Sequence, residues 1–511
     1  MKLEKLILAN FRSYQDEITI DFDDLNVFVG KNDIGKSTIL EALDIFFNEN
    51  KGVIKIDKDD VNKEGRNQGN TDIKIGVVFG DLPDSLTIDT TNPTTLEDEY
   101  LLNSNGFLEI IKIFPNAGKE KVFIKAHHPT NAGCSDLLLK KISDLKKNIT
   151  DEMVCEDKTK SAEIRKAIWN HYSASSDLEL NDIEIELSKI DAKNTWEKIK
   201  DYLPLFSLFQ SDRKNSDGDS EIQNPMKLAV QEILKDEGLR NRLNNVANEV
   251  EEKLREVSDK TLEKLNEMNP EIANSLTPVI PSSESLKWID VFKSVSITGD
   301  DDIPINKRGS GVKRLILLNF FRAEAERRRN ESNVPDVIYA IEEPETSQHP
   351  KHQRKLIEAF IELSRSDNTQ ILLTTHSPSI VKLLEFGHIK LIKEEPQREV
   401  VNVQRGDLPY PSINEVNYLA FGESNDEYHN ELYGFIESES LLSDFKNGKE
   451  TINYIRVKNN GETMEEQKVI SEYIRHQIHH PENTLNEKFT DQQLQESIHQ
   501  MRVFIELQST L

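Results

Sequence analysis

Apolar and polar positions alternate along the first part of the chain in the manner of short strands. Residues 3–11 and 17–22 show the two-residue period of a strand with one solvated face. A continuous apolar run at 25–29 predicts a short buried strand. It leads through a glycine-containing loop into a segment at 37–47 whose apolar residues have helical spacing. Three further strand-like runs lie at 73–79, 107–114 and 121–126.

From about Cys134 the pattern changes to helix-like segments dense in Lys, Glu and Asp. Residues 211–221 are polar, contain glycine and lack apolar periodicity, which indicates a loop. A long amphipathic helix is predicted from about Pro225, with an apolar seam suited to a helical hairpin. The seam residues are Leu239, Leu243, Val246, Val250, Leu254 and Val257. Because sustained heptads are absent beyond this segment, the predicted helical arm is short.

Strand character returns in the second half of the chain. It begins near 288–297, and the apolar runs at 337–342 and 370–374 predict buried parallel strands. Residues 390–393 predict another strand, and after about Gly406 the chain becomes polar and helical to its last residue. Strands separated by helices place the chain in the α/β class.

Composition describes a protein with a highly solvated surface. Hydrophobic residues make up 36% of the chain and charged residues 30%, and no apolar stretch is long enough to span a membrane. The first residues lack the apolar core and cleavage site of a signal peptide. Cys134 and Cys155 are the only cysteines, which fits a reducing cytoplasm better than a disulfide framework. We therefore expect a cytoplasmic protein with no membrane partner.

The charge balance bears on nucleic-acid binding. The chain has 64 Lys and Arg residues against 91 Asp and Glu residues, a net charge of −27. Nonspecific affinity for duplex DNA comes mainly from neutralisation of phosphates by basic side chains, so a protein that coats DNA is disfavoured. A local basic face or a basic partner stays compatible with this composition.

Residues 30–37, GKNDIGKS, match the phosphate-binding loop pattern GxxxxGK[ST] between an apolar strand and a helix. The two glycines allow a backbone geometry in which successive N–H groups face phosphate oxygens. The lysine supplies positive charge to the β- and γ-phosphates, the serine offers a hydroxyl to Mg²⁺, and the helix adds its positive end. The candidate nucleotide-binding residues are Gly30, Asn32, Gly35, Lys36, Ser37 and Thr38.

The apolar run at 337–341 followed by Glu342 and Glu343 has the form of a Walker B strand. In that interpretation Glu342 holds Mg²⁺ through water, and Glu343 orients or deprotonates the water that attacks ATP. The alternative is an acidic helix start, because Glu342, Glu343 and Glu345 surround Pro344. The five apolar residues before the acidic pair favour the Walker B interpretation.

Two further pieces complete the predicted nucleotide site. Ser310 and Gly311 belong to a Gly-Ser-Gly segment at a predicted helix start, where free N–H groups can bind an anion. His376 follows the predicted strand at 370–374 and is expected to contact the γ-phosphate. Each signal is weak alone, since such residues are also common at ordinary helix starts and strand ends.

The order of these four elements resembles the ABC-type ATPase heads of the recF, SMC and OLD group. The resemblance implies a two-lobed α/β head with a short helical or coiled-coil insertion and an α-helical C-terminal region. It also implies an ATP-bridged homo-oligomer, in which Ser310 and Gly311 cap the γ-phosphate bound by another subunit. Residues 347–350 resemble the D-loop. The motifs do not assign the Q-loop glutamine, for which Gln210 is a candidate. The site within one subunit then comprises Lys36, Ser37, Glu342, Glu343 and His376.

Four domains follow from this interpretation. Residues 1–133 form the head lobe with the P-loop, and 134–284 form a helical insertion with a short coiled-coil arm. Residues 285–405 form the second head lobe, and 406–511 form a helical C-terminal domain for a partner or an oligomer interface.

The C-terminal region distinguishes among relatives of this head. OLD-type nucleases carry a Toprim domain, which needs a strand-terminal Glu and a downstream Asp-x-Asp to hold metal. Glu423 has no buried strand before it and no Asp-x-Asp after it, so we expect no Toprim nuclease. With the head motifs, the segments 415–422, 427–434 and 474–483 resemble the ATPase subunit of Septu-type anti-phage systems, the PtuA family. That resemblance implies a separate HNH endonuclease partner, and DNA as the target of the complex.

Other readings of the tail stay open. Arg475 and His480 fit the R-x4-H pattern of HEPN ribonucleases, although along a continuous helix they would lie about 140° apart. His476, His479 and His480 could be proposed as metal ligands, but a polar-interface or helix-end role is favoured because no cysteine or acidic cage accompanies them. The favoured function is an ATPase sensor and scaffold of an anti-phage nuclease complex. The alternatives are a recF-like or SMC-like repair ATPase, or an ATPase with its own nuclease tail.

Overall fold

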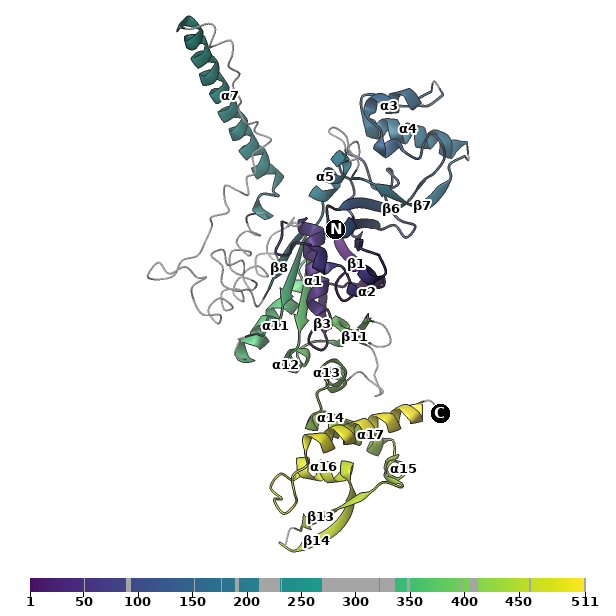
Figure 1. The fold of residues 1–511 in the computed structure, drawn as a ribbon, viewed down its shortest axis with the longest axis vertical. Coiled ribbons are helices and arrows are strands. Elements are labelled where there is room, and N and C mark those ends of the chain that lie inside the picture. Colours follow the sequence, from purple (N-terminus) through teal and green to yellow (C-terminus); the bar gives the residue numbers. More distant parts are fainter. Residues whose placement is uncertain are drawn as a thin grey trace.

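The structure is a computed structural model with an elongated outline (Figure 1). A central head carries the long helix α7 at one end and a separate C-terminal domain at the other. The structure describes residues 1–49, 51–88, 93–150, 152–175, 177–188, 193–210, 230, 232–268, 321, 336–346, 350–394, 398–403, 412–458 and 461–509.

An antiparallel sheet forms the N-terminal part of the head. Its strands are ordered β2-β1-β4-β5-β6-β7, and each pairs antiparallel with its neighbour. The strands are β1 (Lys2–Ala9), β2 (Ile18–Asp21), β4 (Ile73–Gly80), β5 (Leu108–Phe114), β6 (Lys121–Pro129) and β7 (Leu180–Glu186). The helices α3 (Ile142–Asn148) and α4 (Ser161–Ala174) lie beyond β6 and β7 (Figure 1). The strands predicted at 3–11, 17–22, 73–79, 107–114 and 121–126 are all present.

A second sheet carries the candidate site. Its order is β12-β11-β3-β10-β9-β8, and all neighbours are parallel except β11 and β12. The strands are β3 (Leu25–Val29), β8 (Leu205–Phe209), β9 (Val337–Glu342), β10 (Thr369–Thr375), β11 (Ile389–Lys393) and β12 (Glu399–Asn402). Val29 pairs with Thr375, and Glu342 pairs with Thr374. The carboxyl ends of β3, β9 and β10 therefore lie together at one edge of the sheet.

Both faces of this parallel sheet are buried, which explains its nearly continuous apolar strands. On β3, Phe28 packs into the core shared with the first sheet and helix α1 (Lys36–Asn48). Val27 and Val29 point to the opposite face, where α11 (Pro350–Ser364), α12 (Pro378–Val381) and α13 (Ile413–Phe421) supply apolar side chains. The α/β fold predicted for the head is confirmed.

The segment expected to be a helical insertion departs from its prediction. Helices α5 (Lys193–Asp201) and α7 (Glu237–Met268) occur there, but β7 joins the first sheet and β8 the second. β8 is a five-residue run with four buried residues, and such short apolar runs do not reveal by periodicity whether they are strand or helix. The predicted helical insertion at 134–284 thus also contains two strands that the sequence analysis did not predict.

Helix α7 contains the predicted amphipathic seam. Val246 and Val250 of that seam are 57% and 51% exposed. The helix begins at Glu237, whereas the sequence predicted a start near Pro225, which lies outside the described residues. The predicted loop at 211–221 and the predicted strand at 288–297 lie outside them as well.

The C-terminal domain is helical with one β-hairpin. Helices α14 (Asp426–Ser438), α16 (Ile470–His479) and α17 (Asp491–Ser509) enclose its apolar core with α15 (Leu442–Lys446). The hairpin of β13 (Thr451–Val457) and β14 (Thr463–Val469) was not predicted. Its strands are rich in charged residues and mostly exposed, so their apolar pattern is weak; the Asn-Asn-Gly sequence at 459–461 was the available turn signal. The predicted α-helical C-terminal region is otherwise confirmed.

Candidate nucleotide-binding site

The P-loop connects β3 to α1, and two glycines give it its backbone path. Gly35 has φ 106°, and a Cβ atom there would lie 2.7 Å from the Ser13 hydroxyl. Gly30 has φ 155°, and its added Cβ would lie 3.0 Å from Ile34. Residues with side chains rarely adopt these angles, so the loop needs glycine at both positions. The first turn of α1 has no side-chain cap and no acidic residue, which leaves its N–H groups available for phosphate.

Lys36 is buried beneath this loop. Its Nζ donates hydrogen bonds to the carbonyl oxygens of Gly30 at 2.9 Å and Lys31 at 2.8 Å. Burial lowers the pKa of Lys36, while the nearby carboxylates, led by Glu343, act in the opposite direction. An ammonium group held in place with limited hydration is well suited to bind an anion entering the loop.

Glu342 lies at the centre of the candidate metal site. It hydrogen-bonds with Ser37 and Gln210, although burial raises its pKa to about 7. Its Oε1 atom is buried without a hydrogen-bond partner among the described residues, and so is Oε1 of Gln210. Parallel pairing brings Gln210 here, because Phe209 is in register with Ile341.

These residues form a donor set that fits Mg²⁺. The Ser37 hydroxyl and the unpartnered oxygens of Glu342 and Gln210 provide oxygen ligands only, which Mg²⁺ prefers, directly or through water. Mg²⁺ bound here would neutralise charge on the β- and γ-phosphates of a nucleotide. The structure thus brings Ser37 and Glu342 together as the sequence requires, and their role as metal ligands stays a prediction.

Glu343 follows the end of β9 in a strained conformation. Its φ is 41°, in the left-handed region that residues with side chains seldom occupy. Its N–H donates to the carbonyl oxygen of Thr374 at 3.0 Å, which fixes the turn against β10. Oε1 of Glu343 lies 3.1 Å from Nδ1 of His376, at the end of β10. Strain of this kind is retained where the surrounding structure over-determines it, commonly at functional sites.

Glu345 is a site residue that the sequence interpretation did not assign. Its Oε1 accepts hydrogen bonds from the Thr375 hydroxyl at 2.5 Å and from the His376 backbone N–H at 3.3 Å. The carboxylate is 5% exposed, and burial raises its pKa. It therefore anchors the turn that carries His376. The Glu-Glu-Pro-Glu sequence at 342–345 was the available sequence signal for a role of Glu345.

An open cavity of about 440 Å³ lies above these groups. It is lined by Ser13, Asn32, Asp33, Gly35, Lys36, Ser37, Thr38, Glu343 and His376. The sequence-predicted residues Asn32 and Thr38 thus line the same space as Lys36, and Ser13 is an addition. Ser310 and Gly311 lie outside the described residues, as do 347–349 of the predicted D-loop.

The tail residues of the alternative nuclease interpretation face different neighbours. Arg475 pairs with Glu437 at 2.9 Å and lies over the ring of Tyr433 at 4.5 Å, both on α14. His480 follows the end of α16, and its Nδ1 contacts Glu482 at 3.2 Å. This arrangement does not favour a joint catalytic role for Arg475 and His480.

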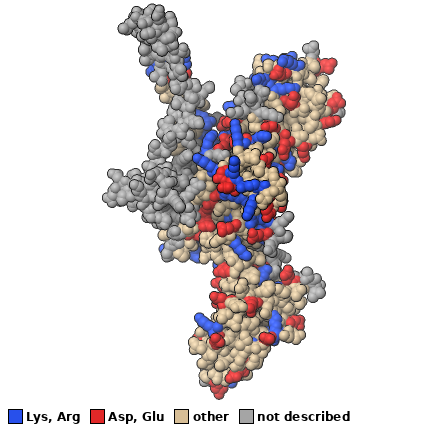
Figure 2. All heavy atoms as spheres, in the orientation of Figure 1, with Lys and Arg blue, Asp and Glu red and all other residues tan. Residues whose placement is uncertain are grey.

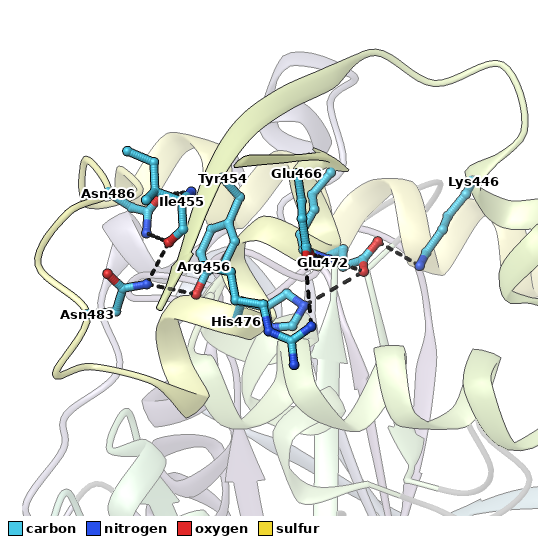
Figure 3. Close-up of polar contacts among 10 residues, drawn as sticks. Lys446, Tyr454, Ile455, Arg456, Glu466, Glu472, His476, Asn483 and Asn486 are labelled. Atoms are coloured by element: carbon cyan, nitrogen blue, oxygen red, sulfur yellow. Dashed lines mark hydrogen bonds and ion pairs between the residues drawn. The ribbon is translucent and has the colours of Figure 1, made fainter. Parts of the chain in front are cut away.

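His476 belongs to a polar network beside the hairpin (Figure 3). Its ring stacks on Tyr454 at 5.1 Å, and its Nε2 lies 3.7 Å from Glu472. Glu472 also binds Lys446 at 2.7 Å. Across the described part of the chain, no group of three or more His, Cys, Asp or Glu side chains is arranged to hold a metal ion. This applies also to the three histidines His476, His479 and His480.

The helices that the structure describes include none that is both long and apolar enough to cross a membrane.

Figure 2 shows Lys and Arg side chains gathered among acidic ones over the middle of the head, whereas the visible face of the C-terminal domain is mainly uncharged.

Two curated nucleases are similar in sequence. The chain is 23% identical over 413 residues to "Endonuclease GajA" of Bacillus cereus (strain VD045), covering 78% of this chain and 59% of that protein. It is 31% identical over 134 residues to "OLD nuclease" of Thermus scotoductus (strain ATCC 700910 / SA-01), covering 26% and 24%. The chain thus spans less than two thirds of the length of either relative.

Solved SMC heads match most of the chain at low similarity. An SmcHead bound to the C-winged helix domain of ScpA has 14% identity and a TM-score of 0.35, covering 79% of this chain and 98% of that one. The SMC head domain from Thermotoga maritima has 14% identity and a TM-score of 0.31, covering 79% and 100%.

A family model provides the assignment. The model described as "AAA ATPase domain" matches residues 1–381, from β1 through the P-loop, Glu342 and His376 to the end of α12. The matched span is most of the chain and includes every residue predicted for the nucleotide site. The protein therefore belongs to the AAA ATPase domain family.

Proposed function

We propose that this protein binds and hydrolyses ATP with Mg²⁺, as the sensor and scaffold subunit of an anti-phage complex that controls a partner HNH endonuclease acting on DNA. The observation that carries the ATPase part is the convergence of three strand ends. β3 leads to Lys36, β9 ends at Glu342, and β10 leads to His376, all at one edge of the sheet. Membership of the AAA ATPase domain family supports the same activity.

Each residue has a defined task in this proposal. Lys36 and the first turn of α1 hold the β- and γ-phosphates, and Ser37 with Glu342 provides the Mg²⁺ ligands. Glu343 accepts a proton from the attacking water, or orients it, while His376 contacts the γ-phosphate. Ser310 and Gly311 complete the site of a second subunit, so that ATP bridges a homo-oligomer.

The nuclease part rests on the relatives and on the tail. The two similar curated proteins are named as nucleases, which associates this type of ATPase with cleavage of nucleic acid. In this chain Arg475 and His480 face different neighbours, and we therefore assign cleavage to a partner. The resemblance to Septu-type ATPase subunits supports an HNH protein as that partner.

The C-terminal domain is the proposed contact surface for that partner or for another copy of the chain. Large apolar side chains are exposed on it, and the face in Figure 2 carries few charges. Interface cores are depleted of charged residues, so this face is suited to contact with another protein. The exposed residues from α14 onward are Val457, Met464, Leu485, Val503 and Leu507.

Co-purification with the products of neighbouring genes, with and without ATP, tests the proposal. Recovery of an HNH protein, together with DNA cleavage that responds to ATP and requires that protein, is the expected result. DNA or RNA cleavage by the purified chain alone, abolished by His480→Ala while ATPase activity survives, would assign the nuclease to the tail. ATPase activity without any nuclease partner would favour a repair ATPase.

A further inference from the structure

One carboxylate joins three elements that are distant in the sequence. Glu41 lies on α1, four residues after Ser37, and its side chain is 12% exposed. Its Oε1 accepts a hydrogen bond from Nε2 of Gln210 at 3.0 Å, and its Oε2 pairs with the guanidinium of Arg12. Gln210 follows β8, and Arg12 lies in the loop after β1. Glu41 thus connects the loop of the first sheet to the carboxyl edge of the second.

The contact with Glu41 determines which end of the Gln210 amide faces which group. An ionised carboxylate only accepts hydrogen bonds, so it can receive the N–H end of an amide but not the oxygen. The Gln210 nitrogen is therefore directed to Glu41, and its oxygen is left buried without a partner among the described residues. A buried acceptor without a partner is costly unless a ligand satisfies it.

The carboxyl group of Glu342 lies next to the same amide. Gln210 and Ser37 both hydrogen-bond with the Glu342 carboxyl group, so the three side chains lie around one small volume. Oε1 of Glu342 is also buried and unpartnered in the described structure. Two unsatisfied oxygens and the Ser37 hydroxyl in one place suit a divalent cation with oxygen ligands.

Arg12 stabilises the charge that this arrangement requires. Its guanidinium binds Glu41 and also Asp60, with Nε at 2.7 Å from Oδ1. The ion pair with Arg12 holds the Glu41 carboxylate in place while its other oxygen accepts the amide N–H. Asp60 is a second partner of Arg12, and its other carboxylate oxygen accepts a hydrogen bond from the Asp57 backbone N–H.

We propose that Glu41 is a positioning residue that fixes the Gln210 amide with its oxygen toward Mg²⁺. Glu41 does not contact the nucleotide; it acts through Gln210 on the metal bound by Ser37 and Glu342. The inference rests on the ATP and Mg²⁺ site of the proposed function. It gives Glu41 a role in metal affinity that is separate from phosphate binding by Lys36.

The experiment measures ATP affinity in EDTA and in saturating Mg²⁺, in full-length protein that carries Glu343→Gln to prevent turnover. Glu41→Gln should lower the Mg²⁺-dependent gain in ATP affinity about tenfold, because loss of a group that orients a metal ligand costs that order. ATP affinity in EDTA should stay unchanged. Gln210→Ala should show the same loss, and the double variant Glu41→Gln/Gln210→Ala should lose no more than Gln210→Ala alone.

Asp60→Asn is the matched control, because it disturbs Arg12 without touching Gln210. It should retain the full Mg²⁺-dependent gain. A wild-type gain in Glu41→Gln, additive losses in the double variant, or an equal loss in Asp60→Asn would each overturn the proposal. If Glu41→Gln fails to fold, Glu41→Asp replaces it; its shorter carboxylate keeps the charge beside Arg12 and withdraws from Gln210, and a retained gain would again overturn the proposal.

A failure of the proposed function would give a different binding result from a failure of the inference about Glu41. If the parent protein with Glu343→Gln does not bind ATP, or binds it equally in EDTA and Mg²⁺, the nucleotide or metal site itself is wrong. The inference about Glu41 fails alone when the parent shows the gain and Glu41→Gln does not reduce it.

Discussion

The imidazole of His376 lies 3.1 Å from the carboxylate of Glu343, Nδ1 to Oε1, at the mouth of the P-loop cavity. The two residues end neighbouring strands, and Glu345 fixes the turn of one of them through two hydrogen bonds. The φ of Glu343 lies in the strained left-handed region, so backbone geometry contributes to the position of this pair. We therefore expect the two residues to act as a unit in the proposed hydrolysis.

Replacing Glu343 should separate ATP binding from hydrolysis. Glu343→Gln keeps the size of the side chain but removes the base that accepts a proton from water, so the single-turnover rate should fall about a hundredfold or more. ATP affinity should be unchanged. Glu358→Gln, at an exposed position on α11, is the control and should hydrolyse ATP normally. Normal hydrolysis by Glu343→Gln would show that another group activates the water.

His376→Ala should slow hydrolysis through the same unit. Loss of a group that contacts the γ-phosphate should lower the single-turnover rate about a hundredfold. If His376 and Glu343 act together, the variant His376→Ala/Glu343→Gln should be no slower than Glu343→Gln alone. Rate losses that multiply in the double variant would contradict a joint role.

Lys36→Ala should weaken nucleotide binding itself. The ammonium is buried under the loop and held by two carbonyl oxygens, and removing a charged hydrogen-bond donor to phosphate should cost about a hundredfold in ATP affinity. Lys31→Ala provides a control in the same loop, since Lys31 is exposed. Equal losses in the two variants, measured by titration with ATP, would show that only the overall charge of the loop matters.

Much of the head could be predicted because its motifs and its apolar runs agree. The runs at 25–29 and 337–342 coincide with β3 and β9, and the spacing of motifs along the chain indicated that their ends meet. Parallel strands buried on both faces leave such continuous runs, and glycines at 30 and 35 identify the loop between strand and helix. The prediction was strongest where the backbone conformation requires one residue type, as at Gly30 and Gly35.

Other features depend on pairing that the sequence does not display. The sequence analysis did not predict β8, because the periodicity of a five-residue apolar run does not distinguish a strand from a helix. Without β8, there was no reason in the sequence to place Gln210 beside Glu342. The role of Glu345 in holding His376 and the link from Glu41 to Arg12 depend on side chains from separate elements. Ordinary Glu and Arg residues carry no local signal of such contacts.

The metal requirement of the ATPase should depend on pH through Glu342. Burial raises its pKa to about 7, so below that pH Mg²⁺ must displace a proton, whereas above it the carboxylate is free to bind. The Mg²⁺ concentration for half-maximal ATP binding should therefore rise about tenfold from pH 8 to pH 6. The pH dependence of Mg²⁺ binding to ATP in the absence of protein is measured separately and subtracted from this change. A requirement that stays constant across this range would contradict the raised pKa.

The C-terminal domain should lose stability in acid because of His429. This residue on α14 is fully buried, its Nε2 contacts the Ser497 hydroxyl at 3.0 Å on α17, and burial lowers its pKa to about 3. The unfolded chain binds a proton near pH 6.5 and the folded domain does not, so stability is full above pH 6.5 and falls as the pH drops toward 3. Between pH 7 and pH 5 the loss should be about 2 kcal/mol, measured by amide hydrogen exchange in α14 and α17. His429→Gln keeps a hydrogen-bonding group for Ser497 but does not titrate, so this pH dependence should disappear; a slope unchanged in that variant would assign the acid sensitivity to other groups.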